Sequence, residues 1–420
     1  MDVVRKVLKR PKNIQTIYLY LVLGNTLATS FIWGINTIFL LDAGLSNFEA
    51  FLANAFYTLG FVIFEVPTGI IADTWGRRTS YLLGCLTLAV STALYLLMWQ
   101  IHGPFFGWAL SSILLGLGYT FFSGALEAWL VDALHATNYK GSLDGVFAKG
   151  QIVGGVAMLT GSVMGGVIAQ FSSLGIPYVL RSLVLLVNFA TAFLLMKDLG
   201  FSPRKSTHYL KEIKNIFKAS IDNGLRNPPV KWMMFSALFV SGVSFYIFYA
   251  LQPFLLELYG DKTAYTVAGL IAALTAVSNI AGGFAAPYIK RLFAKRTSAL
   301  LAGGLFTGII LILVSLTNNF FIAVILIFIW GLLFAALSPI RQAYINGIIP
   351  SAQRATVLSF DSLVGSSGGI VTQPVLGKIA DIYSYSTSYM VAAFIQMGSL
   401  PFIYLARREK AKSDKVEEEK

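Results

Sequence analysis

The stretch GIIADTWGRR, residues 69–78, is a short charged sequence between two long apolar segments. The segments on either side, near 48–73 and 78–100, each have more than twenty residues, which is enough to cross a bilayer as an α-helix. Lys and Arg beside a membrane span gather on the cytoplasmic side. The stretch is therefore predicted to be a cytoplasmic loop between two membrane-spanning helices.

Apolar segments of this kind recur along nearly the whole chain. Of its 420 residues, 56% are hydrophobic and 12% are charged, whereas a soluble domain carries roughly a quarter charged residues. The predicted fold class is all-α integral membrane, with twelve transmembrane helices in two six-helix halves and both termini cytoplasmic. The spans are expected near 14–42, 48–73, 78–100, 104–133, 144–172, 176–197, 229–257, 263–288, 297–315, 319–347, 356–381 and 386–406.

The basic N-terminal segment and the single cysteine give two further expectations. The basic start runs directly into the first span, which is too long for the apolar region of a cleavable signal peptide. Cys85 is the only cysteine, so we expect no intrachain disulfide and a buried or lipid-facing thiol.

The basic residues fall almost entirely on one side of the predicted topology. Of the 32 Lys and Arg residues, 29 lie on the cytoplasmic side, and only Arg181, Lys262 and Lys378 are predicted outside. The net charge of +12 is then expected to face anionic lipid headgroups. Because no basic groove with interleaved aromatic residues is present, nucleic acid is not an expected partner.

The two parts of the chain resemble each other at an offset of about half its length. SGALEAWL at 123–130 matches SPIRQAYI at 338–345, and two shorter matches occur at offsets up to 218. Such repeats place a binding site between the halves near the bilayer midplane. The expected domains are an N-terminal half (1–197), a cytoplasmic linker (198–228), a C-terminal half (229–406) and a charged cytoplasmic tail (407–420).

The loop at 69–78 resembles the signature loop of the major facilitator superfamily, in which an Asp follows a Gly by four residues and precedes Gly-Arg-Arg. The residues that carry this resemblance are Gly69, Asp73, Gly76, Arg77 and Arg78. The resemblance covers the whole chain and implies transport by alternating access. We expect Arg77 to pair with an acid on another helix, with Asp132 the obvious candidate, as a latch between the halves. The alternative is a positive loop that only sets topology.

A finer resemblance is to the Gram-positive tetracycline and multidrug proton antiporters. It rests on Glu65-Val-Pro67 eight residues before Asp73 and on the run from Ser123 to Asp132. Antiporters of the superfamily usually carry a Gly-Pro motif in the fifth span. The glycines Gly161, Gly165 and Gly166 are present here without the proline, which weakens the antiporter assignment.

Acidic residues within or at the ends of the predicted spans are the proton-coupling candidates, because an ionisable group at membrane depth costs about 2.5–3.5 kcal/mol. They are Glu65, Glu127, Asp132 and Asp361. The alternative is that Lys149 or Arg341 neutralises a glutamate. For Asp361, and for Asp144 in the first half, helix capping is the preferred interpretation.

Polar and aromatic residues in the first, seventh and tenth spans are expected to line the substrate cavity, because these spans do so in the superfamily. They are Asn25, Thr29, Trp33, Asn36, Tyr246, Tyr249, Gln252 and Arg341. An apolar cavity of this composition suits a lipophilic, often cationic compound.

The sequence therefore predicts a proton-coupled exporter of amphipathic drugs, such as tetracycline-like compounds, acting as a monomer in a bacterial cell membrane. A metabolite, siderophore or lipid transporter on the same fold is the alternative, and a non-transporting membrane sensor or an enzyme is a remote one. No metalloprotease, phosphate-loop or nucleophile-elbow motif occurs, so neither a catalytic residue nor a cofactor or metal is expected. The partners expected are a small-molecule substrate, protons and the lipid bilayer.

Overall fold

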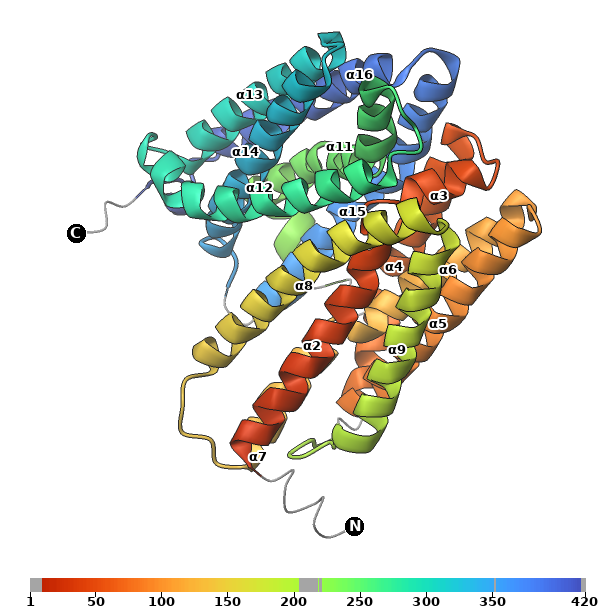
Figure 1. Cartoon of the computed structure of the whole chain (residues 1–420). Helices are drawn as coiled ribbons and strands as arrows, with labels where there is room; N and C mark the ends of the chain where they lie inside the picture. Colours follow the sequence, from red (N-terminus) through yellow and green to blue (C-terminus); the bar gives the residue numbers. More distant parts are fainter. Residues whose placement is uncertain (1–9, 204–217, 219–220, 351–352, 417–420) are drawn as a thin grey trace. The chain divides into compact units, whose positions relative to one another are not determined.

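The computed structural model of the chain describes residues 10–203, 218, 221–350 and 353–416, and its regular elements are helices (Figure 1). Most of the basic N-terminal segment and most of the predicted linker, including 204–217, lie outside the described residues. The first part of the chain forms the helices α2 Pro11–Trp33, α3 Asn36–Asp42, α4 Asn47–Trp75, α5 Arg77–Gln100, α6 Phe105–Phe122, α7 Ala125–Ala136, α8 Leu143–Phe171 and α9 Gly175–Leu195.

The second part repeats this pattern of long helices. A π-helical turn at Ile221–Leu225 precedes it, and a 3₁₀ turn at Lys412–Asp414 follows it. Between the two turns lie α11 Pro228–Tyr259, α12 Tyr265–Arg291, α13 Arg296–Leu316, α14 Phe320–Asn346, α15 Arg354–Ile382, α16 Tyr385–Met397 and α17 Leu400–Arg408.

Three predicted spans are interrupted. The first breaks between α2 and α3 at Gly34, and the last between α16 and α17 at Gly398 and Ser399. The fourth breaks between α6 and α7 at Ser123 and Gly124, where Gly124 adopts a left-handed backbone with φ 67°. Glycine has no Cβ and adopts this backbone conformation without steric cost, so the helix can break at Gly124.

Among the described residues, eleven helices or helix pairs are long and apolar enough to cross a membrane, α6–α7 and α16–α17 each counting as one. α15 has 29 residues but is not one of the eleven. It carries four charged residues, Arg354, Asp361, Lys378 and Asp381, which lower its hydropathy. The twelve-span count therefore stays a prediction.

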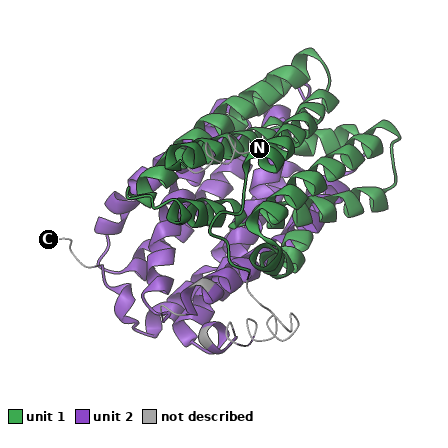
Figure 2. Ribbon diagram, turned by 90° about the horizontal axis from the view of Figure 1, so that it is seen from below, with its two compact units in different colours: residues 1–44, 59–209, 264–273 green, residues 45–58, 210–263, 274–420 purple. Residues whose placement is uncertain are grey.

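The chain forms two compact units (Figure 2). Unit 1 comprises residues 1–44, 59–209 and 264–273, and unit 2 comprises 45–58, 210–263 and 274–420. The units differ from the predicted halves, because the first part of α4 belongs to unit 2 and the first part of α12 belongs to unit 1.

Each of these exchanged helix starts is capped by a side chain from the far end of another helix of its unit. In unit 2, Asp381 near the end of α15 accepts hydrogen bonds from the backbone N–H groups of Asn47 and Phe48, at 2.9 and 2.8 Å. In unit 1, Gln170 at the end of α8 accepts one from the backbone N–H of Thr266, at 3.3 Å. Because the first N–H groups of a helix have no partner within it, these contacts hold the two starts in place.

Glycines allow the close approach of α8 to α2, which lie side by side in unit 1 (Figure 1). A Cβ at Gly165 would lie 2.0 Å from the carbonyl oxygen of Phe31, and one at Gly161 would lie 2.6 Å from Cβ of Ser30. The same close packing occurs in unit 2, where a Cβ at Gly368 of α15 would lie 1.9 Å from the carbonyl oxygen of Leu238 in α11. Small residues thus set the helix separation in both units.

We expect Gly165→Ala to destabilise the protein, because its Cβ would overlap a backbone atom that can move only with the helix. Overpacking of this kind costs about 1–3 kcal/mol. The measurement is the Tm of the purified protein in detergent. Gly155→Ala is the matched control, since Gly155 lies in the same helix with open space around its Cβ position. Equal Tm values for the two variants would contradict this account of the packing.

Candidate functional site

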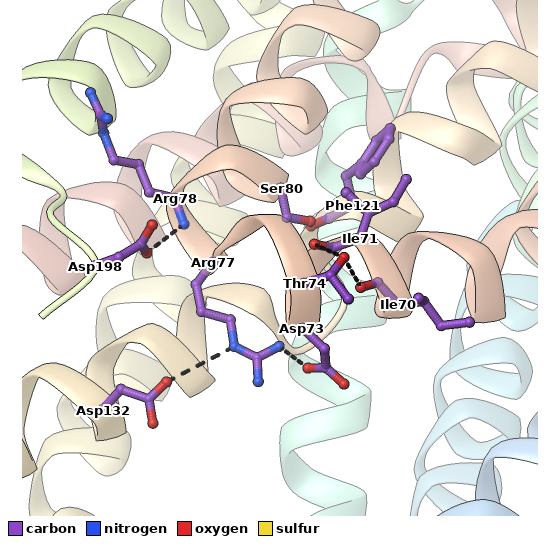
Figure 3. A network of polar contacts seen from close by, with 10 residues as sticks. All are labelled: Ile70, Ile71, Asp73, Thr74, Arg77, Arg78, Ser80, Phe121, Asp132 and Asp198. Carbon is purple, nitrogen blue, oxygen red and sulfur yellow. Dashed lines mark hydrogen bonds and ion pairs between the residues drawn. The ribbon is translucent and has the colours of Figure 1, made fainter. Parts of the chain in front are cut away.

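A cluster of charged residues surrounds the turn between α4 and α5 in unit 1 (Figure 3). Nη1 of Arg77 lies 2.6 Å from a carboxylate oxygen of Asp73, one helical turn earlier. Nε of Arg77 lies 4.0 Å from a carboxylate oxygen of Asp132 in α7. Figure 3 shows the Arg77 guanidinium between the two acids. Asp73 is its closer partner and Asp132 its more distant one.

The predicted pair of Arg77 and Asp132 is present, but it does not join the halves. Both residues belong to unit 1, so their contact ties α7 to the start of α5 within one unit. The expected latch between the halves is therefore wrong for this pair. A conformational role for the loop stays a prediction.

Gly76 fits its position for two reasons. It precedes α5 with a φ of 107°, a backbone conformation that other residues rarely adopt. A Cβ there would also lie 2.5 Å from a carboxylate oxygen of Asp198. Gly69 has open space around its Cβ position, so no neighbour in this structure requires a glycine there.

Asp198, just beyond the end of α9, is a member of this cluster that the sequence analysis missed. Its carboxylate accepts a hydrogen bond from the backbone N–H of Arg78 in the first turn of α5, at 2.9 Å. The Arg78 side chain donates to the carbonyl oxygen of Phe193 at 2.6 Å and lies over the Phe193 ring. Burial raises the pKa of Asp198, and the hydrogen bond from Arg78 and the charges of Arg78 and Arg77 oppose the rise.

Asp414 has the same role in unit 2. It lies 216 residues after Asp198, within the offset range of the internal repeat, and only 3% of it is exposed. Its carboxylate accepts from the backbone N–H and the hydroxyl of Thr297 in the first turn of α13, at 2.8 and 2.9 Å. Arg296 donates to the carbonyl oxygens of Ser413 and Lys415. This part of the predicted charged tail is therefore packed against α13.

Glu65 lies within α4, and its two carboxylate oxygens have different surroundings. Oε1 accepts a hydrogen bond from the hydroxyl of Ser123 at 2.7 Å, whereas Oε2 is buried and has no hydrogen-bond partner among the described residues. Ser123 stands at the break between α6 and α7. The hydrogen-bond partner of Glu65 is thus a hydroxyl. Lys149, the alternative partner considered from the sequence, does not pair with Glu65 in the described residues.

Glu127 lies in the first turn of α7 and is exposed, and it forms no ion pair within the described ranges. A negative side chain in the first turn of a helix is favoured by the positive end of the helix dipole. The structure therefore separates the two glutamates into one that is hydrogen-bonded and partly buried and one that is open.

Asp361 and Arg341 form a bidentate ion pair in unit 2. The guanidinium nitrogens lie 2.7 and 2.6 Å from the two carboxylate oxygens, and Asp361 is 7% exposed. Helix capping by Asp361 is wrong, because α15 begins at Arg354, two turns earlier. Asp144 does lie in the first turn of its helix, where Ser142 provides the cap. The acid that faces Arg341 comes from its own unit.

The predicted cavity residues of the first span lie in unit 1. Trp33 ends α2, and the Asn25 side-chain oxygen is buried without a partner. Asn36 accepts from the hydroxyl of Tyr178 at 3.2 Å, and Thr29 accepts from the hydroxyl of Tyr119 at 3.0 Å.

Arg181, predicted on the outer side, is 1% exposed and lies within α9. It donates to the Thr92 hydroxyl at 3.1 Å and to the Tyr119 hydroxyl at 3.2 Å, while its Nη1 has no partner. Across the part of the chain that the structure describes, no carboxylate forms an ion pair with it. A buried guanidinium without an acid is the second feature that the sequence analysis missed, because a count of basic residues per membrane side does not register burial.

The predicted cavity residues of the seventh span lie in unit 2. Tyr246 is fully buried, packs on Phe51 with ring centroids 4.9 Å apart, and hydrogen-bonds to Ser388. Gln252 is 4% exposed, and Tyr249 is half-buried beside Phe248. Substrate contact by these residues stays a prediction. Within the described residues, no group of three or more His, Cys, Asp or Glu is arranged to hold a metal ion.

The pKa of Asp198 leads to a pH-dependent prediction. Since its pKa is raised on folding, the folded protein binds this proton more tightly than the unfolded chain does. The ionised carboxylate therefore destabilises the fold at neutral pH, and this cost falls as the pH drops through the folded-state pKa. We expect the Tm of the wild type to rise relative to that of Asp198→Asn as the pH is lowered from neutral through the folded-state pKa of Asp198.

Asp261 provides a control of opposite sign, because hydrogen bonds from Thr263 lower its pKa. The Tm of the wild type is expected to fall relative to that of Asp261→Asn as the pH drops through the range where Asp261 becomes protonated. If the Tm difference for Asp198→Asn is independent of pH, the cause assigned to its pKa is wrong.

The ion pair of Arg341 and Asp361 gives a second prediction. Either Arg341→Leu or Asp361→Leu leaves a buried charge without its partner, which destabilises a protein by about 3–5 kcal/mol. The double variant removes both charges, and we expect it to recover most of the loss. Unfolding of the four proteins in detergent, analysed as a double-mutant cycle, measures the coupling. Additive losses would show that the two side chains stabilise the protein independently.

The sequence of the chain matches the Major Facilitator Superfamily over residues 19–332 and 263–420. A relative from Methanocaldococcus jannaschii, an uncharacterised transporter of the same superfamily type, is 20% identical over 405 residues, covering 95% of this chain and all of the relative.

Solved structures with similar folds are transporters too. The nucleoside transporter NupG superimposes with a TM-score of 0.77 at 12% identity, over 94% of this chain and 99% of the other. A bacterial homologue of the human lysosomal transporter Spinster, inward-facing and unoccupied, gives 0.72 at 15%, over 97% and 99%. A peptide-bound transporter of the POT family gives 0.70 at 12%, over 95% and 96%. These likenesses concern the fold alone, whereas the sequence match covers most of the chain. The chain therefore belongs to the Major Facilitator Superfamily of membrane transporters.

Proposed function

We propose that this protein is a secondary active transporter that exports amphipathic, drug-like compounds by alternating access and is driven by proton influx. The observation that carries the proposal is Glu65, a glutamate inside a membrane-spanning helix with one oxygen held by Ser123 and the other buried without a partner. An acid at this depth is costly and is a functional candidate for that reason.

The contact between Glu65 and Ser123 gives proton binding a structural consequence. The ionised carboxylate only accepts hydrogen bonds, so Ser123 must donate to it. A protonated Glu65 has an O–H of its own and can donate, most directly from the oxygen that now lacks a partner. Because Ser123 lies at the break between α6 and α7, the protonation state acts on a junction between two helix segments.

The other acidic candidates are less free to exchange a proton. Asp361 already receives two hydrogen bonds from Arg341, so a proton must compete with a guanidinium. Asp132 lies 4.0 Å from Arg77, and Glu127 is exposed. We therefore rank Glu65 first as the proton carrier and retain Glu127, Asp132 and Asp361 as candidates.

The loop of Asp73, Gly76, Arg77 and Arg78 is proposed as the element that stabilises one conformation. Asp73 pairs with the Arg77 side chain, Asp198 accepts from the backbone N–H of Arg78, and both acids lie in the same unit as the loop. A conformational change that separates α7 from the start of α5 would break the contact of Arg77 with Asp132 and leave its contact with Asp73 in α4 intact.

A second candidate function is transport of an anionic metabolite, and Arg181 is the observation that favours it. No carboxylate among the described residues pairs with its buried guanidinium, and its hydrogen bonds continue through Tyr119 to Thr29, one of the predicted cavity residues. A positive charge close to the predicted cavity residues favours an anionic group on the substrate. Siderophore or lipid transport on the same fold is a further alternative.

We place the protein in the cytoplasmic membrane of its cell, as a monomer that exchanges a small molecule and protons across the bilayer. The matched relative comes from an archaeon, so a bacterial origin stays a prediction. Enzymatic activity is not part of the proposal, since the family and the folds it resembles are those of transporters.

The test is proton movement in everted membrane vesicles that contain the protein. Vesicles are energised, and tetracyclines, macrolides and cationic dyes are added one at a time while a fluorescent probe reports the pH gradient. At least one compound is expected to dissipate the gradient with the wild type and not with Glu65→Gln. Glu257→Gln is the matched control, because Glu257 is an exposed residue near the end of α11.

The outcome separates the two candidate functions. If no compound of the panel moves protons, drug export is abandoned, and uptake of radiolabelled organic acids is measured with the wild type and Arg181→Gln. Loss of acid uptake in Arg181→Gln would support the anionic substrate. If Glu65→Gln still exchanges protons for a drug, Glu65 is not the proton carrier.

A further inference from the structure

Unit 2 contains a cavity of about 150 Å³, and Arg341 is the one residue of its wall that is also a predicted substrate-cavity residue. The wall is formed by residues of α11, α13, α14, α16 and α17 and by Ser399 between the last two, all of which belong to unit 2. Most of its wall is apolar, with Leu300, Phe334 and Leu337 among the lining residues. A few polar residues, including Thr307, Gln396 and Ser399, line the rest.

The amide of Gln396 has an acceptor with no donor. The residue is 2% exposed, and its Nε2 donates to the Thr307 hydroxyl at 2.5 Å. The Thr307 hydroxyl is assigned as the donor to the carbonyl oxygen of Gly303 at 2.9 Å, and with that assignment it accepts from Nε2 of Gln396. The other end, Oε1, is buried without a partner and belongs to a residue that lines the cavity.

The hydroxyl of Ser399 is a second buried group without a partner. Ser399 is fully buried and occupies the position before α17, where a serine normally accepts a hydrogen bond from the helix. It makes no such bond here. Pro401 contributes to this, because it has no N–H to donate at the second position of the helix. The Ser399 hydroxyl can therefore both donate a hydrogen bond to an occupant of the cavity and accept one from it.

Buried polar groups normally have a partner, and leaving one unpaired costs about 1–3 kcal/mol. Three residues of the cavity wall have such an atom, Oε1 of Gln396, Oγ of Ser399 and Nε of Arg341, which indicates that the cavity is built to hold a polar atom. A cavity of this volume accommodates a molecule of about the size of benzene. The one ionisable residue on the wall, Arg341, is already paired with Asp361, which leaves no unpaired charge for a charged ligand.

We propose that this cavity is a binding site for a small neutral aromatic alcohol or an amphiphile of similar size. Its hydroxyl donates to Oε1 of Gln396 and accepts from the Ser399 hydroxyl, and its apolar body lies against Leu300, Phe334 and Leu337. A hydroxyl fits because it donates and accepts at once. The site does not depend on the identity of the transported substrate.

The test uses 3-fluorobenzyl alcohol and 3-fluorotoluene as probes, with the full chain purified in detergent and ¹⁹F NMR to measure binding. The two probes share one apolar body and differ in the hydroxyl. We expect saturable binding of the alcohol and at least about tenfold weaker binding of 3-fluorotoluene. The substitution Gln396→Leu is expected to weaken binding of the alcohol by about tenfold and to leave 3-fluorotoluene unaffected, which corresponds to the loss of one hydrogen bond.

A second variant keeps the test informative if Gln396→Leu does not fold. Ser399→Cys in a Cys85→Ser background places one thiol on the cavity wall, since Cys85 is the only native cysteine. Its modification by neutral methyl methanethiosulfonate is expected to slow about tenfold or more when the alcohol saturates the site. Equal binding of the two probes, or modification that the alcohol does not slow, would overturn the proposal and leave a cavity that holds water only.

Discussion

Charges at the ends of the membrane-spanning helices are neutralised within their own compact unit, and this constraint organises the rest of the structure. Arg77 pairs with Asp73 in unit 1 and Arg341 pairs with Asp361 in unit 2, whereas the Arg78 guanidinium donates to the carbonyl oxygen of Phe193. The bilayer core provides no water to replace a missing partner, which favours pairing within a unit. Arg181 is the exception among the described residues, because its guanidinium donates to hydroxyl groups only. A unit that contains its own ion pairs can move as a body without exposing a bare charge.

The internal repeat includes the side chains that accept hydrogen bonds from the starts of helices. Asp198 and Asp414 each follow the last helix of a half, and each accepts a hydrogen bond from a backbone N–H in the first turn of the half's third helix. Asp381 and Gln170 form another repeated pair, at the opposite ends of α15 and α8, where they cap the starts of α4 and α12. One chemical solution, an acceptor from a distant part of the chain, thus recurs at the starts of α4, α5, α12 and α13.

Local sequence was sufficient to predict where most helices lie, because apolar runs and charged loops alternate along the chain. It did not predict the break at Gly124 or the position of Arg181. The first depends on a single left-handed residue inside an apolar run, and the second on hydrogen bonds to Thr92 and Tyr119 from other helices. Asp361 was misread because its spacing from a serine copies that of Asp144, although α15 begins two turns earlier. The pair Asp198 and Asp414 could have been found from the repeat, because the two residues lie 216 positions apart.

Glu65 and Asp361 show two ways to place an acid inside a membrane protein, and the difference bears on which one can carry a proton. Asp361 is satisfied at both oxygens by one guanidinium, so adding a proton would leave Arg341 with an unneutralised charge. Glu65 is satisfied at one oxygen by a neutral hydroxyl, so a proton on the other oxygen strands no charge and supplies a donor where none exists. If Glu65 carries the proton, as we propose, the free energy of proton binding is available to rearrange Ser123 and the helix junction beside it, because no ion pair has to be broken.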